Sequence, residues 1–204
     1  MTPRVVDKDT KKQEILLAAL EVFSRKGFAK TKMIDVAETA GIGKGTIYEY
    51  FRSKEQVFAE TFHFFMQKSE LLLQDAFSKT DDPVEKLRIF IEIGLVQLLE
   101  DSGEFMSITM DFWAEGIRAK STKIMDLFNL KELYDHYRTL INDVLQEGIQ
   151  SGVFKPINTL NTASAIIAAM DGLMLQWILD PTLFDLKEVA EDFTTGLLNG
   201  IKRL

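Results

Sequence analysis

The residues best suited to chemistry in this chain are the basic and aromatic side chains of Lys44-Gly45-Thr46-Ile47-Tyr48-Glu49-Tyr50 and the nearby Lys54. Lysine pairs with phosphate groups, and polar and aromatic side chains contact sugars and base edges in a DNA groove. Catalytic chemistry has little support, because the chain has two histidines, no cysteine and no HExxH, GxSxG or phosphate-binding glycine loop. We therefore expect no enzyme activity, no metal site and no cofactor.

Two short helices joined by a glycine-bearing turn would have to position these side chains. Apolar residues recur at helical spacing from Met33 to Ala40, and Gly41 then predicts a helix end in the left-handed region. Gly43 offers the turn a second residue that tolerates a positive φ. In the helix that follows, Ile47 and Phe51 lie four residues apart and can face a core, which leaves the polar positions outside.

The next helix has a clear beginning. Ser53 followed by Gln56 is a capping box, so we predict that this helix starts at Lys54 and runs to about residue 79. A first helix over residues 9–27, ended by Gly27, completes a three-helix head. A helix, a turn and a second helix in this order are typical of a helix-turn-helix that enters a DNA groove.

The same segment resembles the DNA-binding domain of TetR/AcrR-type transcriptional regulators over about residues 10–60. The matching pieces are Gly27-Phe28, Thr31, Asp35-Val36-Ala37, Ala40-Gly41-Ile42, Lys44-Gly45-Thr46-Ile47-Tyr48, Tyr50-Phe51 and Ser53-Lys54-Glu55. The resemblance implies that the second short helix faces the groove and its phosphates, and that Thr31 and Lys54 touch the DNA backbone. The predicted DNA-binding residues are Thr31, Lys32, Lys44, Gly45, Thr46, Tyr48, Glu49, Tyr50 and Lys54.

Charge divides the chain in the same way. Residues 1–58 contain 11 Lys and Arg against 8 Asp and Glu, whereas residues 59–204 contain 13 against 23. A basic head on an acidic body suits a protein that binds nucleic acid with one end. We predict a DNA-binding domain over 1–53 and a helical bundle over 54–204. With no secretory signal and no uninterrupted apolar run long enough for a membrane helix, we expect a cytoplasmic protein.

The remainder of the sequence reads as successive helices. Asp82-Pro83-Val84-Glu85 is a strong helix start, and this helix runs to about Glu100. Further helices fit residues 104–118, 121–151, 158–179 and 185–203, punctuated by Gly152, Pro156 and Pro181. The predicted fold is all-α, with about nine helices.

The bundle has two plausible tasks, and the resemblance implies both. The first is dimerisation through the last two helices, 158–179 and 185–203, which would place two heads on a palindromic operator. The apolar run at 163–170 needs cover on several sides, and residues 185–203 carry an apolar stripe. That stripe consists of Leu186, Val189, Phe193, Leu197 and Ile201.

The second task is to bind a small, apolar effector that releases a repressor from its operator. The middle helices are rich in methionine and aromatic residues, which suit an adaptable apolar pocket but equally suit a plain core. Asp171 interrupts an apolar run and would need a partner if buried. The predicted ligand-binding residues are Phe62, Phe65, Met66, Met106, Met110, Trp113, Phe128, Met170, Met174 and Trp177. The alternative is a constitutive DNA-binding and dimerisation protein without a small-molecule ligand.

Overall fold

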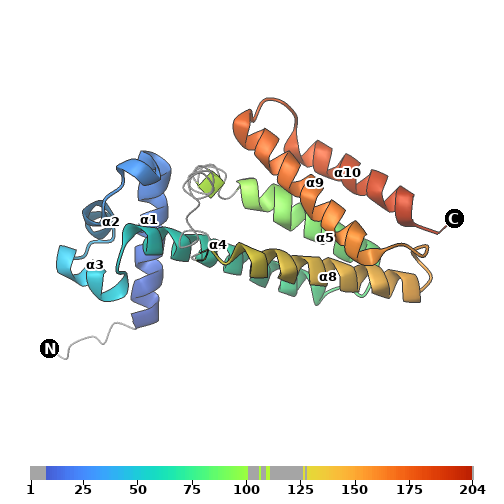
Figure 1. Ribbon diagram of the computed structural model, residues 1–204, viewed down its shortest axis with the longest axis horizontal. Helices are drawn as coiled ribbons and strands as arrows, with labels where there is room; N and C mark the ends of the chain where they lie inside the picture. Colours follow the sequence, from blue (N-terminus) through green and yellow to red (C-terminus); the bar gives the residue numbers. More distant parts are fainter. Residues whose placement is uncertain (1–7, 101–105, 107–108, 111–125, 127, 204) are drawn as a thin grey trace. The chain divides into compact units, whose positions relative to one another are not determined.

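A computed structural model describes residues 8–100, 106, 109–110, 126 and 128–203 (Figure 1). Within these residues the chain forms eight α-helices and one short π-helical segment and no β-strand, which confirms the predicted all-α fold. The predicted helix at 104–118 and the beginning of the one at 121–151 lie largely outside the described residues.

The chain divides into two compact units. The first comprises Met1–Gln67 and Glu104–Asn129, and the second comprises Lys68–Gly103 and Leu130–Leu204. Helix α4 (Lys54–Phe77) starts in the first unit and ends in the second. The predicted domain boundary after residue 53 coincides with the start of α4, whereas the compact units divide within that helix. The boundary of the DNA-binding domain therefore stays a prediction.

Three helices precede α4 in the first unit. They are α1 (Lys8–Lys30), α2 (Met33–Thr39) and α3 (Lys44–Tyr50). Gly27 interrupts α1 with a φ of 73°, so the regular helix ends where the glycine predicts it. Helix α2 packs against both α1 and α3.

The turn between α2 and α3 depends on Gly41, which has a φ of 64°. Its backbone N–H donates to the carbonyl of Glu38 at 3.1 Å, and the N–H of Ile42 donates to the carbonyl of Ala37 at 2.9 Å. These two bonds satisfy carbonyls that the end of α2 would otherwise leave open. The expectation for Gly43 was wrong, because this residue caps α3 with a φ of −68° and an extended backbone.

A cluster of phenylalanines forms the core of the first unit. Phe58 of α4 lies at its centre, with its ring centroid 4.8 Å from that of Phe23 and 5.1 Å from that of Phe28. Phe128 contacts both Phe58 and Phe62 through edge-on ring contacts. Such edge-to-face pairs add to the stabilisation that burial of the rings supplies.

The second unit is a helical bundle, and three of its helices begin at local side-chain caps. Asp82, Asn158 and Asp185 each accept a hydrogen bond from a backbone N–H in the first turn of the helix that follows. This satisfies donors that a helix start leaves free. Its elements are the end of α4, α5 (Pro83–Ile91), η1 (Glu92–Gln97), α8 (Leu130–Gln150), α9 (Thr159–Leu179) and α10 (Leu186–Ile201).

The π-helical segment η1 lies in the helix that the sequence predicts from Pro83 to about Glu100. It packs against α9 and α10, while α5 packs against α8 and α10. Gly94 of η1 permits close approach to α9, because a Cβ atom there would lie 2.9 Å from Cε of Met170. The extra residue in a π-helical turn widens the helix locally.

Candidate nucleic-acid interface

Helix α3 turns one side to the core and presents the other to solvent. Ile47 and the residue that ends the helix, Phe51, are fully buried. Lys44, Gly45, Tyr48 and Glu49 are exposed, and Tyr48 keeps 49 % of its surface accessible. Thr46 and Tyr50 are half-buried. The buried pair fixes the rotation of α3, so the predicted groove-facing residues lie largely on its solvent side.

The junction between α1 and α2 is held by Asp35. Its carboxylate pairs with Nζ of Lys26 at 2.9 Å and accepts a hydrogen bond from the backbone N–H of Lys32 at 2.8 Å. The bond from Lys26, followed by that from Lys32, lowers the pKa of the Asp35 carboxyl below its ordinary value. One side chain therefore braces α1 and caps the start of α2, the helix that supports α3.

This brace predicts a pH-dependent contribution to stability. A carboxyl whose pKa is depressed on folding stabilises the fold above its unfolded pKa of about 3.9, and this contribution is lost as pH falls through the lower folded pKa. We expect Asp35→Asn to lower the free energy of unfolding by about 1 kcal/mol at neutral pH. The difference from wild type should shrink below about pH 4. Urea denaturation at several pH values measures it, and a difference that grows on acidification would contradict the prediction.

Lys54 lies at the start of α4 but interacts with the end of α1. Its Nζ donates to the carbonyl of Phe28 at 2.8 Å and lies 4.2 Å from the centroid of the Phe28 ring. A cation at a helix C-terminus meets carbonyls that have no partner within the helix. Lys54 thus has a structural role within the head, which the sequence did not indicate. Its contact with DNA stays a prediction.

We expect Lys54→Ala to have two separable effects. Loss of the carbonyl and ring contacts should lower the free energy of unfolding by about 1–2 kcal/mol. Loss of a phosphate contact should weaken binding to all DNA sequences and reduce the salt slope by about one unit per half-site. Thermal denaturation and DNA titrations at several salt concentrations measure the two effects. If Lys54→Ala lowered stability but left the salt slope unchanged, Lys54 would have only a structural role and would not contact a phosphate group.

Thr31 and Lys32, the two residues that precede α2, differ in exposure. Thr31 is buried, and its hydroxyl donates to the carbonyl of Gly27 at 2.8 Å. A buried hydroxyl that already donates a hydrogen bond within the protein is poorly placed to bind a phosphate group. The geometry therefore favours a structural role for Thr31. Lys32 is exposed. Contact of either residue with DNA is untested.

The predicted ligand-binding residues fall into both compact units. In the first unit, Phe62, Phe65, Met106 and Phe128 are buried, while Met66 and Met110 are half-buried. In the second, Met170 and Met174 are buried and Trp177 is half-buried. Trp113 lies outside the described residues. That these residues line one cavity stays a prediction.

Asp171 has the partner that a half-buried carboxylate requires. The hydroxyl of Tyr134 on α8 donates to Oδ2 of Asp171 on α9 at 3.0 Å. Burial raises the pKa of the Asp171 carboxyl, and the bond from Tyr134 opposes this effect. Burial, followed by the charge of Asp171, raises the pKa of the Tyr134 hydroxyl. Tyr134 and Asp171 therefore form a polar contact within the interface between α8 and α9.

A shallow cavity of about 620 Å³ lies between α1 and α4 in the first unit. Lys12 and Glu60 line it and form an ion pair of 2.5 Å between the two helices. His63 also lines it and is exposed, so the cavity is a polar surface feature. None of its lining residues was predicted to bind DNA or an effector.

Comparison with known families gives two matches that follow the same division of the chain. The family model for "Bacterial regulatory proteins, tetR family" matches residues 15–61. The model for "BetI-type transcriptional repressor, C-terminal" matches residues 83–199, which is more than half of the chain.

Individual relatives match over nearly the whole length. The transcriptional regulator AcrR of Shigella flexneri is 29% identical over 192 residues, covering 92% of this chain and 87% of its own. A transcriptional regulator from Saccharomonospora viridis in complex with choline has a TM-score of 0.81 and 22% identity, covering 97% and 100% of the two chains. FadR from Bacillus subtilis in complex with stearoyl-CoA has a TM-score of 0.75 and 24% identity, covering 93% and 98%.

Proposed function

Since this chain belongs to the TetR family of bacterial regulatory proteins and is a DNA-binding transcriptional repressor, we propose that it acts as a homodimer that an apolar molecule releases from a palindromic operator. The observation that carries the DNA-binding part is the exposure of Lys44, Tyr48 and Glu49 on a helix held by Ile47 and Phe51. The regulated DNA lies in the cytoplasm, and we place the protein there.

The dimer is proposed to form through α9 and α10. On α9, Ala165, Ala168, Leu175 and Leu179 are exposed, and they recur at spacings of three, four and seven residues, so they share one side of the helix. By length and composition alone, α9 is also the one described helix that is apolar enough to cross a membrane. An apolar surface of this kind on a helix that packs on α8 and η1 is suited to a second protomer.

Helix α10 supplies a second part of this surface. The predicted stripe divides, because Leu186 and Ile201 are buried within the protomer whereas Val189, Phe193 and Leu197 are half-buried. The three half-buried side chains are accessible to a second protomer. In a twofold dimer, α9 and α10 of each protomer would form a four-helix interface.

A charge within this surface should dissociate the dimer. Leu175 is 45 % exposed, and we expect Leu175→Glu to yield a monomer, since an unpaired carboxylate would be buried on association. Leu71→Glu on α4 is the matched control, because Leu71 is exposed but lies on neither proposed interface helix. Sedimentation velocity measures the molar mass. A Leu175→Glu protein that remains dimeric would exclude this interface.

The releasing ligand is proposed to be apolar and to bind among the methionine and aromatic residues of the bundle. Support comes from their number and burial, and from a relative of the same fold whose structure contains stearoyl-CoA. Helix α4 belongs to both compact units, so it offers a continuous element through which a ligand can bias the head. Release requires that the ligand bind the DNA-free state more tightly than the DNA-bound state.

The test is fluorescence anisotropy with the DNA upstream of the protein's own gene, at two salt concentrations and with scrambled competitor. Specific binding of two protomers per site, or a multiple of two, would support the proposal. Stearoyl-CoA, a free fatty acid, a steroid and choline are then added in turn. We expect an apolar member of this panel to weaken operator binding by about 1–3 kcal/mol. Tight apolar binding that leaves operator affinity unchanged would exclude release by such a ligand.

A further inference from the structure

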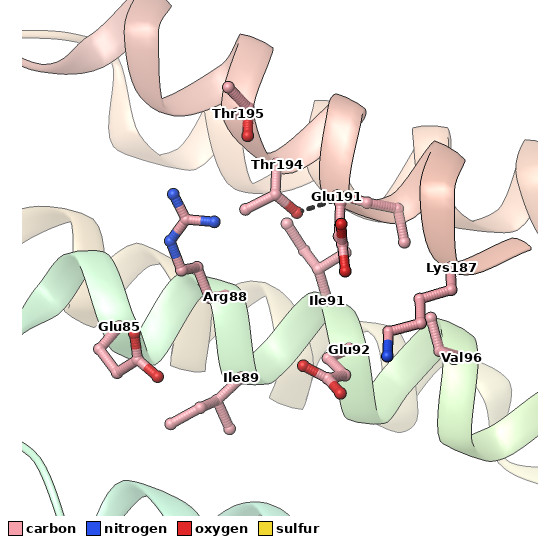
Figure 2. Close-up of a pocket in the computed structure, with 11 residues that line it drawn as sticks. Glu85, Arg88, Ile89, Ile91, Glu92, Val96, Lys187, Glu191, Thr194 and Thr195 are labelled. Atoms are coloured by element: carbon pink, nitrogen blue, oxygen red, sulfur yellow. Dashed lines mark hydrogen bonds between the residues drawn. The ribbon is translucent and has the colours of Figure 1, made fainter.

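A charged groove lies between α5, η1 and α10 in the second unit (Figure 2). Its volume is about 280 Å³, which is at the small end of ligand pockets. None of its lining residues belongs to the predicted effector set, so the groove is separate from the apolar site proposed above. The polar residues around it are Glu85, Arg88, Glu92, Lys187, Glu191 and Thr195.

The five charged side chains of the groove form no ion pair with one another or with any other described residue. Neighbouring charges in the same bundle do pair: Lys86, beside Glu85 on α5, reaches Glu147 at 2.7 Å. Opposite charges around the groove are therefore unpaired among the described residues, although both signs are present. This arrangement leaves donors and acceptors available to a ligand that carries both charges.

The floor of the groove is mainly apolar. Ile91, Val96 and Ala190 are buried, and so is Thr194, whose hydroxyl donates to the carbonyl of Ala190 at 2.6 Å. The floor side chains therefore offer no free polar group to a ligand. A molecule that fits would lie with an aliphatic part on this floor and its charged ends toward the rim.

The charges at the rim are distributed along the groove. Arg88 extends toward the side on which Thr195 lies, while Glu92, Glu191 and Lys187 lie together farther along the groove (Figure 2). Three carboxylates face two cations, so the groove carries a formal charge of −1. A ligand with one carboxylate and two cationic groups would balance this charge.

We propose that the groove is a second ligand site that binds a free basic amino acid. The ligand carboxylate pairs with the guanidinium of Arg88 and accepts a hydrogen bond from the hydroxyl of Thr195. Its aliphatic chain lies on the apolar floor, and its ammonium groups pair with Glu92 and Glu191. Because the ligand would join α5 and η1 to α10, it would also fix the helix that we propose for the dimer interface.

Isothermal titration calorimetry of the full chain with L-lysine and L-arginine tests the proposal without DNA. We expect saturable binding at millimolar concentrations or below. The probe 1,5-diaminopentane keeps the two cationic groups but lacks the carboxylate, and it should bind about tenfold more weakly or not at all, since one charge-assisted pair is lost. Failure of both amino acids to bind would overturn the proposal. Tighter binding of L-glutamate would also overturn it, because the charge assignment would be reversed.

Variants locate the site. Arg88→Gln and Glu191→Gln should each weaken L-lysine binding about tenfold, whereas Asp192→Asn, beside Glu191 but outside the groove, should not. Thr195→Trp fills the groove from an exposed position and should abolish binding even if Arg88→Gln proves unstable. Thermal denaturation checks that each variant folds. Binding that survives Glu191→Gln and Thr195→Trp would lie elsewhere and would refute the assignment.

Discussion

Replacing Phe58 with alanine is expected to cause the largest loss of stability of any single change considered for this protein. Phe58 is fully buried and contacts the rings of Phe23, Phe28 and Phe128. Removal of a buried phenylalanine ring typically costs about 3–5 kcal/mol, because apolar burial is lost and a cavity remains. This is a large part of the roughly 5–15 kcal/mol that stabilises a typical domain. We therefore expect the head to be partly unfolded and operator binding to be lost with it.

Urea denaturation followed by circular dichroism measures the effect of Phe58→Ala. Leu17→Ala is the control, since Leu17 lies on α1 with 52 % of its surface exposed. The control should change the free energy of unfolding by no more than about 0.5 kcal/mol. A loss below about 1 kcal/mol for Phe58→Ala would mean that the phenylalanine cluster does not hold the head together.

The helix starts could be predicted from the sequence because capping is local. Asp82 and Ser53 bond to backbone N–H groups of the first turn that follows, so the residues within four positions determine the start. Gly27 and Gly41 adopt positive φ values where a helix must end, which is again a local requirement. Burial of Ile47 and exposure of Tyr48 followed from helical spacing alone.

Other features depend on neighbours that are distant in sequence. Lys54 meets carbonyls at the end of α1, 25 and 26 residues earlier, and no local pattern indicates this contact. Periodicity found the stripe on α10 but could not separate Leu186, buried within the protomer, from Phe193, which is half-buried. No pattern in the sequence singles out the charges on α5, η1 and α10. Only the packing of these three elements brings them around one groove.

The second large effect concerns DNA affinity, and Tyr48 is the residue that should show it most clearly. Tyr48 is exposed on α3 beside the exposed Glu49, while the buried Ile47 and Phe51 anchor the helix to the core. Truncating an exposed side chain changes the free energy of unfolding by no more than about 0.5 kcal/mol. We therefore expect Tyr48→Ala to keep the stability of wild type and to lose operator affinity.

The loss of binding free energy caused by Tyr48→Ala should be doubled in the proposed twofold dimer, because each half-site loses one contact. A lost base contact costs about 1–3 kcal/mol per half-site, so a dimer should lose about 2 kcal/mol or more, which is roughly 30-fold or more in affinity. Tyr48→Phe separates the hydroxyl from the ring. Leu17→Ala again serves as the control, because it alters exposed apolar surface away from α3.

Salt dependence distinguishes this loss from that of a phosphate contact. Tyr48 is uncharged, so Tyr48→Ala should lower the affinity for operator DNA without changing the slope against salt concentration. Lys44→Ala should instead reduce that slope by about two units for a dimer, since each half-site would lose one phosphate contact. Anisotropy titrations with operator and scrambled DNA at several salt concentrations measure both quantities. If Tyr48→Ala bound operator as wild type does, the exposed side of α3 would not face the groove, and the DNA-binding surface would have to lie elsewhere on the head.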